Sequence, residues 1–132
     1  MSPELEQQLI KKYPALFQDT DKPATESLMC FGCECRDGWY NIIESACGII
    51  SHYIEQRRKT NDLSSFRWMQ IKEKFGTLRL YHSGDADEYI LGVTDMAEDL
   101  SGSVCEVCGN VGQLCGTGWY QTLCPEHEKL LP

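Results

Sequence analysis

The chain has 132 residues, of which 42% are hydrophobic and 24% are charged, a composition typical of one globular domain and not of a disordered protein. No apolar run approaches the roughly 20 residues that cross a bilayer, and the start MSPELEQQLIKKY lacks the pattern of a secretory signal. We therefore expect a cytoplasmic protein, in which the eight cysteines favour metal binding or buried thiols over disulfides.

The net charge of −8 is concentrated in the last fifty residues. Residues 1–82 carry 11 Lys or Arg and 11 Asp or Glu, whereas residues 83–132 carry 1 and 9. Such a surface repels nucleic acid phosphates, unless it imitates them. The charges therefore favour a protein partner over a nucleic acid, although a solvated face that only keeps the chain soluble is the simpler interpretation.

Two helices are predicted in the first sixty residues. Residues 3–17 place apolar side chains near helical spacing, and Pro14 is expected to end or bend this helix. Residues 18–36 are expected to form a loop. Residues 37–59 form the clearest helix, with Asp37 as its expected cap and Trp39 as an anchor in the core. The apolar positions of this helix are Ile42, Ile43, Ala46, Cys47, Ile49, Ile50, Tyr53 and Ile54.

A β-hairpin and another helix follow. Alternating residues over 66–81 predict two strands with a turn near Lys74–Thr77. Residues 85–100 predict an amphipathic helix with acids in its first turn. Its inward face is expected to hold Tyr89, Ile90, Val93, Met96, Ala97 and Leu100. We therefore expect an α+β fold, with helices packed on a β-hairpin over residues 1–102 and a finger module over residues 103–132.

The stretch CEVCGNVGQLCGTGWYQTLCPEH holds the candidate metal site. Cys105 and Cys108 form a C-x2-C pair followed by Gly109, which is typical of a zinc knuckle. Cys124 and His127 form a C-x2-H pair in which the intervening proline suits the start of a helix. Knuckle, hairpin and helix-borne ligands predict a treble-clef-like zinc finger. Four protein ligands close a tetrahedral Zn²⁺ site, which makes its role structural.

Other assignments of the cysteines remain open. Cys115 is an alternative fourth ligand, but it has no second ligand at turn spacing beside it. A redox C-x2-C pair is expected at a helix start after a strand, whereas this pair follows a Ser-Gly-Ser break. Cys30, Cys33, Cys35 and Cys47 are candidates for a second zinc site, although a gap of one residue makes it awkward for Cys33 and Cys35 to bind the same ion. The alternative is that Cys35 and Cys47 pack as small apolar side chains.

Catalytic chemistry is not evident. Treble-clef nucleases need a histidine base and further metal ligands, but residues 111–123 contain no His, Asp or Glu. No nucleophile can be paired with His52 or His82 from the sequence. An enzyme that uses Lys72, Glu73 and Arg79 in a cleft is an alternative, and charges that alternate on the surface of a hairpin are the simpler explanation. We expect a chain without enzymatic activity.

Three stretches together resemble a known family. CRDGWYNIIESAC, QIKEKFGTLRLY and CEVCG…GWYQTLCPEH are similar to blocks of small uncharacterised proteins from phages, prophages and bacteria. The resemblance covers about residues 28–128, and cysteines 30, 33 and 115 depart from it. It implies an α+β domain followed by a cysteine-bearing finger, in a bacterial or phage-infected cytoplasm.

The leading functional hypothesis is a zinc-binding accessory protein that binds a protein partner, including a host complex that it inhibits through an acidic surface. The alternative is a nucleic-acid-binding regulator that uses the 66–81 hairpin. That hairpin is the one basic region after the long helix, and Trp68, Phe75 and Tyr81 are candidates for stacking on bases.

Overall fold

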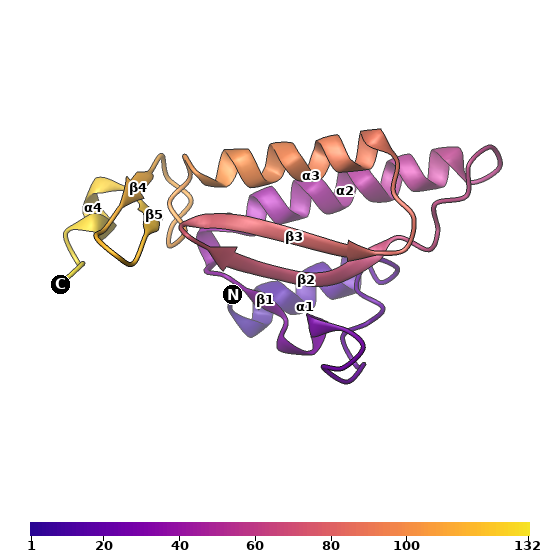
Figure 1. The fold of residues 1–132 in the computed structure, drawn as a ribbon, viewed down its shortest axis with the longest axis horizontal. Coiled ribbons are helices and arrows are strands. Elements are labelled where there is room, and N and C mark those ends of the chain that lie inside the picture. The colour runs from indigo at the N-terminus through magenta and orange to yellow at the C-terminus, as the bar shows by residue number, and fades with distance from the viewer.

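The structure, a computed structural model, describes all residues from Met1 to Pro132 and has a mixed α+β fold (Figure 1). No helix in it has both the length and the apolar composition needed to span a membrane. The elements in chain order are α1 (Pro3–Lys12), the 3₁₀ turn η1 (Leu28–Phe31), β1 (Cys33–Glu34), the 3₁₀ turn η2 (Asp37–Trp39), α2 (Tyr40–Arg57), β2 (Arg67–Lys74), β3 (Thr77–Ser83), α3 (Glu88–Ser101), β4 (Gln113–Cys115), β5 (Gln121–Leu123) and α4 (Pro125–Glu128).

The main sheet has the order β1-β2-β3. Strands β2 and β3 form the predicted antiparallel hairpin, in which Ile71 lies opposite Leu80 and both are buried. A β-bulge between Trp68 and Gln70 shifts the register of β2. Strand β1 lies in the segment predicted as loop, and it pairs in parallel with β2, with Cys33 opposite Ile71.

The core lies between the sheet and the helices. Figure 1 shows α2 and α3 side by side along the hairpin, and α3 packs on β3. The side chains of Trp39 and Trp68 are fully buried in one cluster with Ile43 and Leu78. The prediction that Trp39 anchors the core is therefore confirmed, since its ring is 0% exposed.

The predicted capping role of Asp37 is wrong. Residues 37–39 form the turn η2, and α2 begins at Tyr40 with no side chain capping its first turn. The Oδ1 atom of Asp37 instead accepts a hydrogen bond from the backbone N–H of Ser2 at 2.7 Å. The carboxylate thus holds the start of α1 to this turn, across a sequence separation of 35 residues that local patterns do not reveal.

Helix α3 begins with a side-chain cap at Asp87, whose Oδ1 accepts from the N–H of Ile90 at 3.1 Å. The prediction of its inward face is only partly correct. Ile90 and Ala97 are buried and Val93 is half-buried, but Tyr89, Met96 and Leu100 are 50%, 55% and 47% exposed. The helix therefore turns an apolar stripe partly towards solvent. In α2, Ile49 is likewise 38% exposed.

Candidate metal centre

The first half of the candidate metal centre is a tight turn after α3. The N–H of Cys105 donates to the carbonyl of Asn110 at 2.7 Å, and the N–H of Gly109 donates back to the carbonyl of Cys105 at 2.9 Å. Gly109 has a φ of +82°, a conformation that a side chain disfavours. This turn folds the chain so that the sulfurs of Cys105 and Cys108 lie on one side, as the C-x2-C spacing predicts.

The second half comes from the short hairpin β4–β5 and the turn α4. Gln113 pairs with Leu123 and Cys115 with Gln121, which returns the chain to the first turn. Cys124 then precedes α4, and its carbonyl accepts from the N–H of His127 at 3.1 Å. This single helical turn directs the sulfur of Cys124 and the ring of His127 towards the same point.

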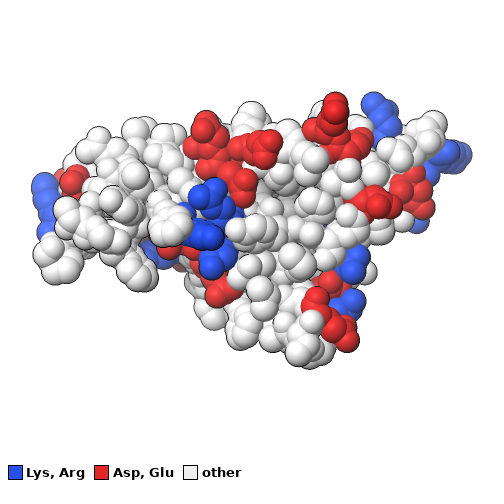
Figure 2. Space-filling view, viewed as in Figure 1, with Lys and Arg blue, Asp and Glu red and all other residues white.

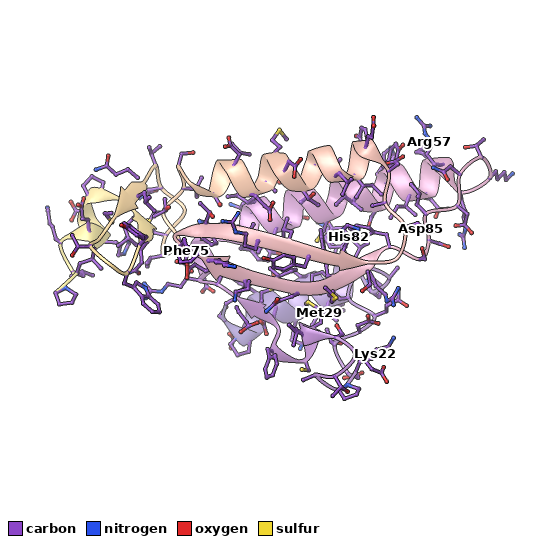
Figure 3. The ribbon with its side chains drawn as sticks, viewed as in Figure 1. Lys22, Met29, Arg57, Phe75, His82 and Asp85 are labelled. Atoms are coloured by element: carbon purple, nitrogen blue, oxygen red, sulfur yellow. The ribbon has the colours of Figure 1, made fainter.

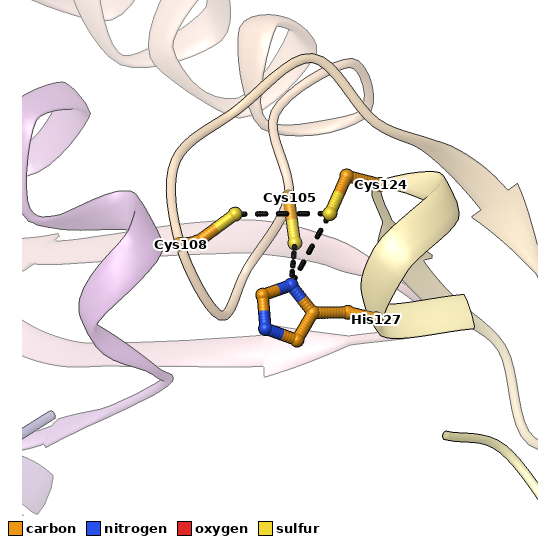
Figure 4. A group of neighbouring side chains, drawn as sticks. All are labelled: Cys105, Cys108, Cys124 and His127. Atoms are coloured by element: carbon orange, nitrogen blue, oxygen red, sulfur yellow. Dashed lines mark hydrogen bonds between the residues drawn. The ribbon is translucent and has the colours of Figure 1, made fainter. Parts of the chain in front are cut away.

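The four predicted ligand side chains converge (Figure 4). Their ligand atoms all lie within 4.8 Å of one another. The Sγ atoms of Cys108 and Cys124 are 3.7 Å apart, and the Sγ atoms of Cys105 and Cys124 lie 3.5 and 3.2 Å from Nδ1 of His127. No other group of three or more His, Cys, Asp or Glu side chains is close enough in this structure to hold a metal ion.

The donor set fits a metal ion, with zinc as the best match. Usual Zn–S and Zn–N bond lengths place two ligands of a tetrahedral ion about 3.8 Å apart for two sulfurs and about 3.6 Å apart for sulfur and nitrogen. The spacings of 3.7 and 3.5 Å match those edges, and the third, 3.2 Å between Sγ of Cys124 and Nδ1 of His127, is shorter. Three thiolates and an imidazole are also the ligands that zinc prefers. A tetrahedral ion bound by all four side chains has no open position for a substrate.

The environment of Cys105 favours the thiolate that a metal requires. Burial acts to raise the pKa of this thiol, but the backbone N–H groups of Cys124, Cys108 and Val107 point to it and lower its pKa to about 6. The pKa of Cys108 is raised, because its own backbone contact with Asn110 is outweighed by burial and by the neighbouring sulfurs. The sulfur of Cys105 therefore ionises more readily than an ordinary thiol.

Cys115 lies outside this group of ligands. It is half-buried, and its Sγ donates to the carbonyl of Gln121 at 3.4 Å across the β4–β5 pair. Burial raises its pKa. These contacts describe a neutral thiol within the hairpin.

The four remaining cysteines do not form a second such group. Cys30 is exposed, whereas Cys33, Cys35 and Cys47 are buried in the main core. Burial raises the pKa of Cys33 and of Cys47 to about 12, and the pKa of Cys35 is also raised. The sulfur of Cys47 accepts a hydrogen bond from the indole N–H of Trp68 at 3.4 Å. The three buried thiols thus pack as small apolar side chains.

The finger, residues 103–132, is seated on the turn that precedes α2. The N–H of Gly38 donates to the carbonyl of Glu106 at 2.7 Å, and the indole N–H of Trp39 donates to the carbonyl of Val104 at 2.8 Å. A Cβ atom on Gly38 would lie 2.1 Å from the carbonyl oxygen of Cys105, so only glycine allows this approach. The carboxylate of Glu106 accepts from the N–H of Arg36 at 3.1 Å, and burial raises its pKa.

A second contact joins the finger to the turn between β2 and β3. The hydroxyl of Thr122, which is fully buried, donates to the carbonyl of Gly76 at 2.7 Å. Gly76 has a φ of +84°, and a Cβ atom there would lie 2.4 Å from the side chain of Leu114. Figure 3 shows Phe75 at the end of the hairpin that faces the finger. The finger therefore contacts two turns of the main domain, one at Gly38 and one at Gly76.

The hairpin offers fewer stacking groups than predicted. Trp68 is 0% exposed and cannot reach a base, whereas Phe75 and Tyr81 are 67% and 37% exposed. Lys72 and Arg79 are cross-strand neighbours. Figure 2 shows basic side chains gathered over this part of the molecule.

Glu73 and the two histidines of the main domain make structural contacts or lie on the surface. Glu73 accepts a hydrogen bond from the N–H of Gly76 at 3.0 Å, so its carboxylate holds the turn. His52 is exposed on α2, and the ring of His82 stacks 5.0 Å from that of Phe66 (Figure 3). Burial lowers the pKa of His82. The contacts of His52 and His82 do not include a nucleophilic side chain.

No family model, curated protein or solved structure matches the chain.

Proposed function

We propose that this chain is a zinc protein without enzymatic activity, in which one structural Zn²⁺ is bound by Cys105, Cys108, Cys124 and His127 in a treble-clef-like finger. The convergence of these four side chains supports the metal, and the closed ligand set supports a structural role. The buried apolar cluster of the finger contains only Cys105, Leu123 and Cys124, which is too little to hold some thirty residues without a metal.

The proposed activity is the binding of a protein partner through the acidic surface of α3. The single observation that carries it is a set of carboxylates without cationic partners: Asp85, Asp87, Glu88, Asp95, Glu98 and Asp99. None of them takes part in the five ion pairs of the chain, and no Lys or Arg occurs between residues 80 and 128. Figure 2 shows acidic side chains along the edge where α3 lies. Such a surface attracts a cationic partner and repels phosphates.

The experiment is affinity capture with two matched baits, the wild type and the variant Asp95→Asn/Asp99→Asn, from nuclease-treated bacterial lysate. The wild type is expected to retain a protein that dissociates as salt rises, and the variant to retain several-fold less. Equal retention by both baits would exclude α3 as the binding surface. Recovery of nucleic acid without protein from untreated lysate would favour the alternative function.

The alternative, nucleic-acid binding by the 66–81 hairpin, is favoured by one observation. Lys72 and Arg79 lie side by side in the sheet and belong to no ion pair. Phosphate binding there would weaken steeply with salt in a gel-shift experiment. The burial of Trp68 removes one of the three stacking groups on which this alternative depended. Protein binding therefore remains the leading proposal.

The proposed setting is a bacterial or phage-infected cytoplasm, in which the chain acts as an accessory protein and inhibits a host complex. The resemblance of the DGWY, KEKFG and C-x2-C…C-x2-H blocks supports this setting, and the acidic surface supports competition for a cationic site on the host complex.

A further inference from the structure

A shallow apolar groove runs between α2 and α3. It has a volume of about 250 Å³ and is lined by Asn41, Ile42, Ser45, Ala46, Val93, Met96, Ala97 and Leu100. Six of these eight residues are hydrophobic. Of these, Met96 and Leu100 are 55% and 47% exposed, so the groove leaves two large apolar side chains in contact with water.

The rim of the groove carries charge of one sign along α3. Glu88, Asp95 and Asp99 are all exposed, and the spacings of seven and four residues place them on one face of the helix, next to Met96. The α2 side contributes the neutral side chains of Asn41 and Ser45. An occupant of this groove must therefore be apolar on one side and cationic beside it.

Gly92 adds an independent observation. It lies inside α3, where glycine is less stable than alanine by roughly 1 kcal/mol. It is exposed, and a Cβ atom on it would meet no other atom within 4 Å, so packing in this chain does not require glycine. It lies one turn from Met96 and from Glu88. At Gly92 the backbone of α3 is therefore accessible to a partner, between the groove residue Met96 and the acidic residue Glu88.

From these observations we propose that the α2–α3 groove binds a cationic amphipathic helix of a partner protein. This rests on the function proposed above and names the class of segment that the acidic surface receives. Apolar side chains at i, i+3 or i+4 and i+7 enter the groove, and Lys or Arg on the flank pairs with Asp95 and Asp99. The distance from Tyr89 to Leu100 along α3 is about 16 Å, which matches about three helical turns.

Other occupants fit less well. A second copy of this chain would bring the same carboxylates face to face, with no cation on α3 to pair with them. Nucleic acids and anionic lipid surfaces are repelled by the same rim. A neutral apolar peptide would leave three exposed carboxylates beside it without partners.

The test uses a fluorescent 14-residue peptide of leucine and lysine with leucines at helical spacing, measured by anisotropy. Two control peptides are an isomer of the same composition with leucines all round the helix, and a leucine–glutamate version. The wild type is expected to bind the first peptide at least tenfold more tightly than either control. Equal binding of the isomer would overturn the proposal, because charge alone would then explain the affinity.

Matched variants locate the contact. Met96→Gln changes the groove and Leu91→Gln changes an apolar residue of the same helix that does not line it, with 41% exposure. We expect at least a tenfold loss of affinity for the first and less than twofold for the second. Gly92→Leu is expected to cause a similar loss while Tm is kept or raised, since leucine favours helix. Equal losses for Met96→Gln and Leu91→Gln would refute the groove.

The two proposals fail in different ways. If Asp95→Asn/Asp99→Asn abolishes peptide binding while Met96→Gln and Gly92→Leu leave it unchanged, the acidic surface binds and the groove does not. If no cationic peptide binds the wild type, the groove proposal is wrong, while the lysate capture still decides whether α3 binds a folded partner. If lysate capture is the same with both baits while the peptide contacts Met96 and Gly92, the peptide site is not the partner surface.

Discussion

Substitution of Cys108 by serine removes one candidate metal ligand and leaves the apolar packing of the finger unchanged. The side chain of Cys108 is exposed, so its loss removes almost no buried apolar surface. Structural zinc binding in isolated fingers amounts to about 10–16 kcal/mol, or roughly 3 kcal/mol for each of four ligands. Since each 1.4 kcal/mol is about tenfold in affinity, we expect Cys108→Ser to weaken zinc binding at least about a hundredfold.

The measurement is competition for zinc with a chromophoric chelator, together with metal analysis of protein purified without added metal. The wild type should contain close to one zinc per chain. Cys115→Ser is the matched control, since this thiol lies in the same finger but outside the ligand group. It should keep the zinc affinity of the wild type and lose no more than about 1 kcal/mol of stability, the usual contribution of one hydrogen bond.

Hydrogen exchange shows how far the effect of losing the metal spreads. Chelation should remove protection from residues 105–128 and from the amide of Gly38, which donates to Glu106. The β2–β3 ladder, including the pair Ile71 and Leu80, should stay protected, because its core does not contain the finger cysteines. Equal zinc affinity of Cys108→Ser and wild type would refute the ligand assignment, and so would an equal loss in Cys115→Ser.

Two further predictions concern residues outside the metal site. Asp87→Ala should lower the free energy of unfolding by about 1–2 kcal/mol, because it removes the cap of α3. Asp37→Ala should lower it by less than about 1 kcal/mol, since only one exposed contact with Ser2 is lost. Urea unfolding measures both values, and the reverse order would contradict these assignments. Trp39→Phe should lower the free energy of unfolding by about 2–4 kcal/mol, because it leaves the carbonyl of Val104 without its donor and creates a cavity. An unchanged urea midpoint would show that this contact does not hold the finger.

Local patterns were sufficient for the long helices, the β2–β3 hairpin and the group of candidate ligands. The β2–β3 hairpin and the helices follow from alternation and helical period, which depend only on neighbouring residues. The four candidate metal ligands follow from two C-x2 spacings, since each pair is brought together by a single turn. The short β4–β5 hairpin alone brings the Cys105/Cys108 pair to the Cys124/His127 pair, so their convergence could be predicted without knowledge of contacts between distant segments.

Contacts between distant segments could not be predicted in this way. Strand β1 has two residues and exists because it pairs with β2, some 38 residues away. Asp37 resembles a helix cap in the sequence, but the N–H of Ser2 competes for its carboxylate. For Met96 and Leu100, the period correctly indicated an apolar stripe. It could not indicate that α2 covers only part of that stripe.

The DGWY turn with Gly38 and the β2–β3 turn with Gly76 have a common structural role, since both hold the finger against the main domain. Gly38 and Trp39 bind its first turn, and Gly76 accepts from Thr122 in its hairpin. Because α2 starts at Tyr40, directly after this contact, the finger also fixes the first turn of α2. That turn supplies Asn41 and Ile42 to one wall of the groove. If the finger holds the proposed metal, that metal would also support the proposed binding groove without touching it, because it would fix the position of the helix that forms one side of the groove.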